Sequence, residues 1–80
     1  MSQPTNSPQP EIAEFLAAGS TSCQEGRYEA ALAAYEHAIR LAPNEPCAYT
    51  GKGFVLLEIH RFGEALAAFE QALQLAQALG

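Results

Sequence analysis

The side chains that could take part in chemistry are few and widely spaced. His60 and Glu64 stand four residues apart, a spacing that places both on one face of a helix, where they could flank a metal ion. Two ligands are too few for a closed metal site, so we expect solvated side chains there and at His37. The sequence contains no glycine-rich phosphate loop, no cysteines at metal-ligand spacing and no nucleophile motif. We therefore predict no catalytic, metal-binding or cofactor-binding residues, and we expect that the chain is not an enzyme.

The two cysteines could form a disulfide only if the fold brought them together. Cys23 falls near the end of one helical segment, and Cys47 falls near the start of the equivalent segment further along the chain. If these two helices run parallel, the thiols lie at opposite ends, too far apart for a disulfide. We predict two free thiols.

Charge and composition limit the classes of partner. The formal net charge is −5, because nine glutamates outnumber four scattered cations, Arg27, Arg40, Lys52 and Arg61. Nucleic acids and anionic membranes are polyanions and would be repelled, so we expect neither as a partner and instead expect a protein segment that is neutral or basic. No apolar stretch is long enough to cross a bilayer, and no secretory signal is present, so we expect a cytoplasmic protein.

An internal repeat organises the chain. Residues 26–36 read GRYEAALAAYE, and residues 60–70, which begin 34 positions later, read HRFGEALAAFE. A fixed period of about 20 to 50 residues is typical of proteins built from stacked structural repeats. Abundant Ala, Leu and Glu favour helices, so each unit should be a pair of helices.

Hydrophobic spacing and helix-breaking residues predict an all-α fold made of two stacked antiparallel helix hairpins. The expected helices span about 11–25, 28–41, 45–59 and 62–79, with Pro10 suited to a first helical position. A turn over residues 42–46 separates the hairpins, and Asn44 can cap the third helix. Residues 1–10, rich in Pro, Ser and Gln, should be a disordered leader preceding one domain over residues 11–80.

Two glycines lie in the middle of predicted helices. Glycine costs about 1 kcal/mol relative to alanine there, so a compensating contact is expected. We predict that Gly19 and Gly53 let their helices nest against Ala31 and Ala65 of the hairpin partners, with aromatic residues filling the space on either side.

The chain resembles the tetratricopeptide repeat (TPR) family, whose pattern combines aromatic, Gly and Ala positions with a closing Pro. The resemblance covers residues 12–79, with one repeat at 12–45 and a second at 46–79, as in a fragment of an α-solenoid. The matching residues are Phe15, Ala18, Gly19, Tyr28, Ala31, Tyr35, Ala38 and Pro43 in the first unit, and Tyr49, Gly53, Phe62, Ala65, Phe69 and Ala72 in the second. The departures are Ser22 and Lys52 in place of bulky residues, His60 in place of Gly, and Gln77 in place of Pro.

The resemblance implies a scaffold or adaptor that binds a partner peptide or helix in a groove lined by the first helix of each repeat. The matching groove residues are Ala13, Leu16, Ala17, Ser20, Cys23, Gln24, Cys47, Thr50, Gly51, Phe54, Leu57 and Glu58. Leu16, Phe54 and Leu57 would anchor an apolar segment. The family's basic clamp for a terminal carboxylate is not supported, because the matching positions hold Leu16, Ser20 and Gly51.

The last predicted helix is apolar over most of its circumference, so we expect more than one of its faces to be covered. A longer repeat array or a helix supplied by a partner could provide this cover. Two alternatives to groove binding also follow: the chain could self-associate, most simply as a homodimer, through this helix, or it could be the regulatory N-terminal part of a larger, possibly enzymatic, protein. The residues expected in self-association are Leu66, Phe69, Leu73, Leu75, Ala76 and Leu79.

Overall fold

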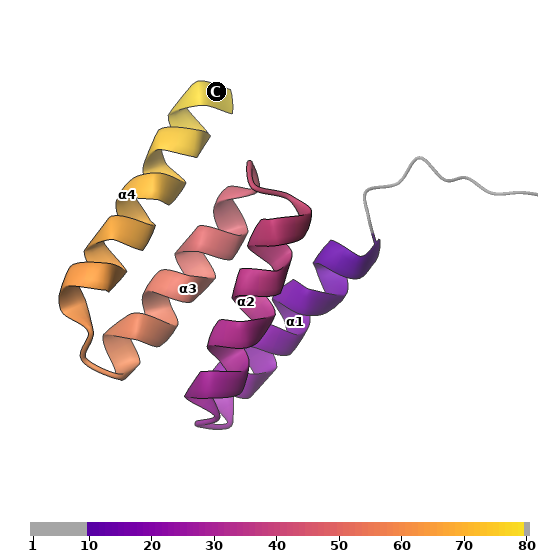
Figure 1. The fold of residues 1–80 in the computed structure, drawn as a ribbon, viewed down its shortest axis with the longest axis vertical. Helices are drawn as coiled ribbons and strands as arrows, with labels where there is room; N and C mark the ends of the chain where they lie inside the picture. The colour runs from indigo at the N-terminus through magenta and orange to yellow at the C-terminus, as the bar shows by residue number, and fades with distance from the viewer. Residues whose placement is uncertain (1–9, 80) are drawn as a thin grey trace, which may run out of the picture.

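A computed structural model describes residues 10–79, which form four helices in two antiparallel hairpins (Figure 1). Helix α1 spans Pro10–Gln24, α2 spans Tyr28–Leu41, α3 spans Pro46–Glu58 and α4 spans Phe62–Leu79. The described residues contain no strand, and the predicted all-α fold is confirmed. The leader predicted at residues 1–10 lies outside the described part of the chain except for Pro10, which is the first residue of α1.

The cap of α3 differs from the prediction. The N-cap residue is Glu45, not Asn44, and its carboxylate accepts a hydrogen bond from the backbone N–H of Cys47 at 3.3 Å. Pro46 follows at the first helical position, where its missing N–H costs nothing. The turn before it is tied down by the Tyr49 hydroxyl, which donates to the Pro43 carbonyl at 3.1 Å.

Both hairpin turns end their first helix in the same way. After α1, Arg27 N–H donates to the Ser22 carbonyl at 2.8 Å, and after α3, Arg61 N–H donates to the Leu56 carbonyl at 2.8 Å. This Schellman closure needs one left-handed residue, and Gly26 supplies it with φ of 81°. At the equivalent place His60 adopts φ of 65°, a conformation that favours glycine.

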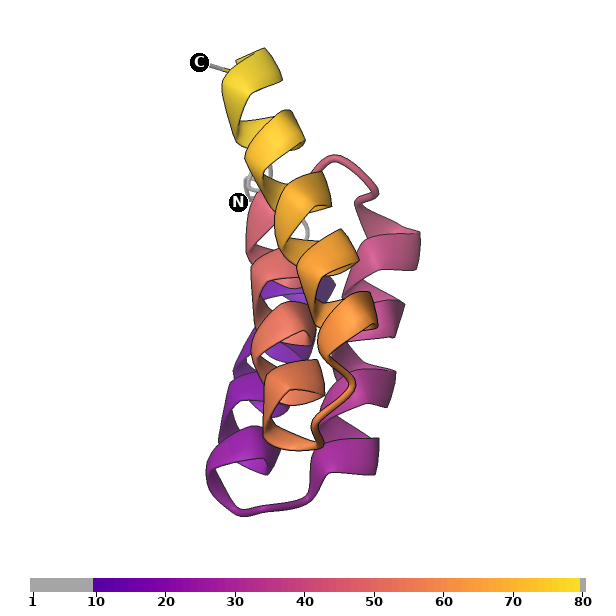
Figure 2. The same cartoon turned by 90° about the vertical axis from the view of Figure 1, so that its left-hand side faces the viewer.

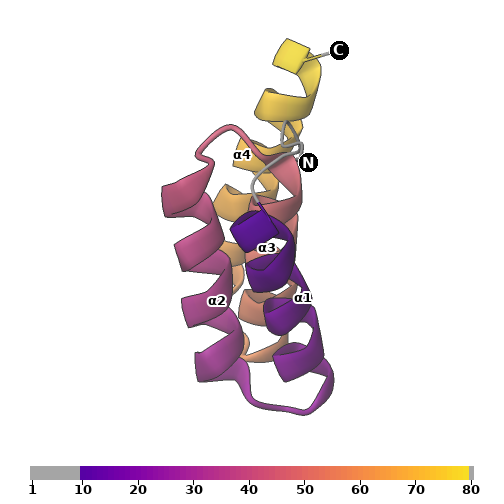
Figure 3. The same ribbon diagram turned by 90° about the vertical axis from the view of Figure 1, so that its right-hand side faces the viewer.

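The helices pack in chain order. Helix α2 lies against α1 and α3, α4 lies against α3, and α1 also touches α3 (Figures 2 and 3). Within the described residues α4 contacts no other helix, and its last turns project beyond α3 (Figure 2). The buried core consists of Ala31, Leu32, Tyr35, Val55, Leu56, Ala65 and Ala68. None of the described helices is long and apolar enough to span a bilayer.

Glycines let aromatic rings into the helix crossings. A Cβ atom added to Gly19 would lie 2.7 Å from the Tyr35 ring, and one added to Gly53 would lie 2.7 Å from the Phe69 ring. The aromatic rings of the hairpin partners are thus the nearest neighbours of these glycines, as expected for rings beside the crossing, and direct nesting against Ala31 and Ala65 stays a prediction. A third glycine, Gly51 of α3, faces the opposite edge of the Tyr35 ring, so this ring is held between two helices.

Candidate functional site

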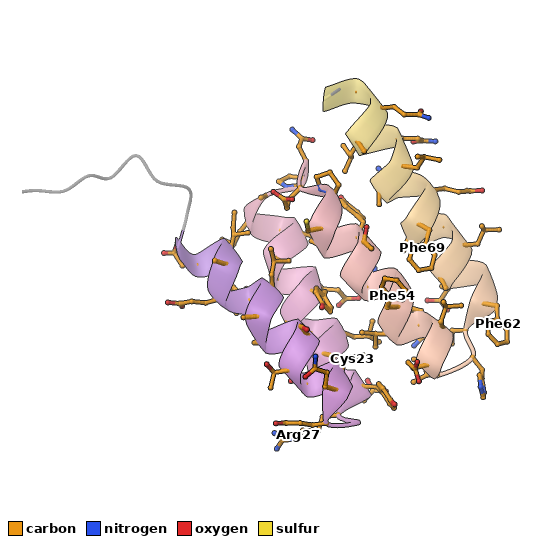
Figure 4. The ribbon with its side chains drawn as sticks, turned by 180° about the vertical axis from the view of Figure 1, so that it is seen from behind. Cys23, Arg27, Phe54, Phe62 and Phe69 are labelled. Carbon is orange, nitrogen blue, oxygen red and sulfur yellow. The ribbon has the colours of Figure 1, made fainter. Side chains whose placement is uncertain are left out.

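The twelve predicted groove residues all lie on α1 and α3, which run beside each other on one side of the molecule (Figure 4). We call this surface the α1/α3 face. Eight of its members are exposed, namely Ala13, Ala17, Ser20, Gln24, Cys47, Phe54, Leu57 and Glu58. The other four, Leu16, Cys23, Thr50 and Gly51, are half-buried.

Large apolar side chains on this face come from α3. Phe54 is 56% exposed and Leu57 is 38% exposed, three residues apart on the same helix. The Phe54 ring meets the Phe69 ring edge to face, with centroids 5.2 Å apart and an interplanar angle of 78° (Figure 4). This contact holds Phe54 in place while leaving more than half of it open to solvent.

Four predicted groove residues take part in contacts inside the fold. Leu16 and Cys23 pack against the hydrophobic core, and Gly51 lies against the Tyr35 ring. The Thr50 hydroxyl donates to the Pro46 carbonyl of its own helix at 3.1 Å. The open apolar part of the α1/α3 face is therefore narrower than the sequence predicts.

The two cysteines are free thiols, as predicted. Burial, followed by the nearby Glu58 carboxylate, raises the pKa of the Cys23 thiol above its ordinary value of 9.0. Burial, with a hydrogen bond and the negative charge of Glu45, raises the pKa of Cys47 as well. Both thiols are protonated and weakly nucleophilic at neutral pH. The negative charge of Glu58 on α3 thus acts on the Cys23 thiol of α1, across the α1/α3 face.

The histidines have specific neighbours. His37 is exposed to solvent, as predicted, and it also stacks on Phe15 with ring centroids 4.4 Å apart. The Glu64 carboxylate, the other candidate metal ligand beside His60, accepts hydrogen bonds from Arg61 at 2.8 and 3.1 Å. Within residues 10–79 no three His, Cys, Asp or Glu side chains gather where they could hold a metal ion.

Two family comparisons match this arrangement of helices. A model described as "TPR repeat" matches residues 19–59, and one described as "Tetratricopeptide repeat" matches residues 48–79. The chain is a two-repeat member of the tetratricopeptide repeat family. No curated protein sequence matches the chain.

Tetratricopeptide repeats in general mediate binding to other proteins, and the family is generally non-catalytic. The predicted repeat boundaries at 12–45 and 46–79, and the assignment of the α1/α3 face as the TPR groove, stay predictions.

Two hollows lie on other surfaces of the TPR chain, and none of the twelve predicted residues lines them. One of about 310 Å³ is lined by Tyr49, Lys52, Glu64, Ala67, Ala68 and Gln71. The other, of about 280 Å³, is lined by Glu29, Leu32, Ala33, Glu36, Lys52, Leu56, Arg61 and Glu64. Lys52 belongs to both, and its Nζ lies 3.5 Å from a Glu36 carboxylate oxygen. In the sequence, Lys52 stands out because it departs from the TPR pattern, but nothing in that departure predicts a hollow.

The residues predicted for self-association are distributed over α4. Leu66 is 59% exposed and Leu73 is 58% exposed. Ala76 is exposed, whereas Phe69 and Leu75 are half-buried. The Leu79 side chain lies outside the described residues. Self-association of the TPR chain through these residues stays a prediction.

Proposed function

We propose that this TPR protein binds an apolar segment of a partner protein across the α1/α3 face, with Phe54 and Leu57 as the anchors. The observation that supports the proposal is that both side chains remain exposed on a helix whose opposite sides are packed against α2 and α4. Fixed apolar anchors of this kind carry most of the energy of protein interfaces.

Charge favours a neutral or basic partner segment. The chain has a net charge of −5, and Glu58 is the one ionised side chain among the twelve residues of the α1/α3 face. A cation on the partner beside Glu58 would gain electrostatic attraction, whereas an acidic segment would be repelled.

Selection from a displayed library of random peptides would test the proposal. We expect the selected peptides to be apolar with basic residues. Their affinity for the protein should fall at least tenfold with Phe54→Glu or Leu57→Glu, because each change places a charge where an apolar anchor must be desolvated. Leu41→Glu is the matched control, since Leu41 is a 44% exposed leucine at the end of α2, away from this face.

Circular dichroism would confirm that all three variants keep their helices. Peptides that bind the Phe54 and Leu57 variants as tightly as they bind the parent would show that the α1/α3 face is not the binding surface.

A further inference from the structure

The internal repeat allows each residue of α4 to be compared with its counterpart in α2. The α4 stripe is the set Phe62, Leu66, Phe69 and Leu73, and the corresponding α2 stripe is Tyr28, Leu32, Tyr35 and Ile39. Both have the spacing of one helical face. Leu32 is 8% exposed whereas Leu66 is 59% exposed, because α3 packs against α2 and no helix in the described part of the chain packs against this side of α4. The covered α2 stripe therefore shows what the open α4 stripe can accept.

The helix that covers the α2 stripe presents small residues at the contact. Gly51 of α3 lies against the Tyr35 ring, where a Cβ atom would collide with the ring. Ala48 and Val55, on the same face of α3, are fully buried. The Phe69 ring is the counterpart of Tyr35, and it meets a glycine on one edge only, that of Gly53. It also contacts the Phe54 ring edge to face, with centroids 5.2 Å apart, and no second glycine of the described residues lies against it as Gly51 lies against Tyr35.

The charge of Glu70 sets a second requirement for a helix that covers the α4 stripe. Glu36, which borders the α2 stripe, pairs with Lys52 of α3 at 3.5 Å. Its counterpart in α4 is Glu70, which is exposed and forms no ion pair with any residue in the described range 10–79. A helix covering the α4 stripe as α3 covers the α2 stripe would place a cation beside Glu70 at the position directly after its glycine.

A second copy of the chain does not meet these requirements. The counterpart of α3 in the first repeat is α1, and it carries Glu14 where α3 has the fully buried Ala48. It also carries Ala17 where α3 has Gly51, so its Cβ would meet the Phe69 ring. Pairing of two α4 stripes would bring two Glu70 carboxylates and two chains of charge −5 together.

We propose that the α4 stripe docks a helix of another protein segment, with an Ala-x-x-Gly-Lys-x-x-Val pattern or a close chemical equivalent. The glycine packs against the Phe69 ring on the side away from Gly53, the cation pairs with Glu70, and the small and β-branched residues cover Leu66 and Leu73. This surface adjoins the α1/α3 face at the Phe54–Phe69 contact, but its exposed leucines, Leu66 and Leu73, belong to α4 alone.

A synthetic peptide with the sequence of residues 45–60, carrying Cys47→Ser, is a suitable probe because it contains the covering pattern. We expect it to bind the 80-residue chain and to shift the amide NMR signals of the α4 stripe. Leu66→Glu in the protein should reduce affinity at least tenfold, whereas Leu41→Glu and Leu57→Glu should leave it unchanged. The Leu57 control separates this surface from the proposed function.

Two changes in the peptide test the recognition itself. Gly51→Leu in the peptide should weaken binding at least tenfold, because the new side chain overlaps Phe69. Lys52→Glu in the peptide should weaken binding about two- to fivefold, as expected for an exposed ion pair, and Glu70→Lys in the protein should restore it.

Four results would overturn the proposal: no binding at millimolar peptide, binding that tolerates Gly51→Leu, NMR shifts spread over α3 that indicate its displacement, or sedimentation showing that the unliganded protein dimerises through Leu66. The last result would identify a second copy as the occupant instead.

Discussion

The Tyr35 ring, held between Gly19 and Gly51, makes a sharp prediction about Gly51→Ala. The new Cβ would overlap the ring, and the ring cannot move away because Gly19 closes its other edge. Overpacking of this kind costs about 1–3 kcal/mol, and a fully enclosed ring places the cost near the upper end. The higher helix propensity of alanine returns about 1 kcal/mol. The net loss in the free energy of unfolding should be about 2 kcal/mol.

Such a loss is large for this chain. A single core in 80 residues rarely supplies more than about 3–5 kcal/mol, so Gly51→Ala should remove roughly half of the stability. For a domain of this size about 1 kcal/mol shifts the melting temperature by 4–8 °C, and thermal denaturation should therefore show a fall of about 8–16 °C.

Two matched glycine variants serve as controls. Gly53→Ala presses on Phe69, which is half-buried and lies against one glycine rather than between two, so the overpacking cost should be near its lower limit and the net effect near zero. Gly63→Ala, with nothing within 4 Å of the added atom, should stabilise α4 by about 0.5–1 kcal/mol. A Gly51→Ala protein that melts at or above the parent, or all three variants shifting alike, would refute the argument that Tyr35 is enclosed.

Four other substitutions give measurable outcomes. Ala31→Leu and Ala65→Leu, at positions that are 0% and 1% exposed, should each lower the free energy of unfolding by about 1–3 kcal/mol in chemical denaturation, and unchanged midpoints would contradict the tight crossing. His60→Gly should raise it by about 0.5–1 kcal/mol, because φ of 65° costs an L-residue more than the added freedom of glycine in the unfolded chain; a lower melting temperature would show otherwise. Glu58→Gln should lower the Cys23 pKa toward 9.0 and shift the pH profile of its alkylation to lower pH, as followed by mass spectrometry. Because the folded protein holds this proton more tightly than the unfolded chain, stability should fall as pH rises above 9.0 through the folded pKa, and less so in the variant; identical pH profiles would count against the Glu58 contribution.

The helices could be predicted closely because the sequence marks their ends. The bounds of α2 and α4 match the prediction, and those of α1 and α3 differ by one residue at each end. Pro43 and Pro46 fix the turn between the hairpins through their restricted backbone. The sequence could not show that Glu45 rather than Asn44 caps α3, because both carry an oxygen that can accept a backbone N–H.

Packing partners were harder to predict than helices. Spacing places Gly19 and Gly53 on the inner faces of their helices, but it does not tell how far a neighbouring side chain reaches along the crossing. The rings of Tyr35 and Phe69 reach the glycines before Ala31 and Ala65 do. Side-chain length and direction, which are set by the tertiary structure, decide such contacts.

The candidate site could be predicted only in part, because spacing along a helix shows which face a residue lies on but not which neighbour it contacts. The exposure of Phe54 and Leu57 agrees with the surface expected from the TPR pattern. Gly51 was assigned to that surface as well, yet it packs against Tyr35. Helix α3 contacts three other helices, so a residue between two of its faces cannot be assigned from spacing alone.

The ring between two glycines has a consequence for how the chain unfolds. Tyr35 belongs to the first hairpin, but part of its shelter comes from the second, so neither hairpin retains a complete interior without the other. We therefore expect the two 34-residue units to unfold together as one body rather than as two independent ones.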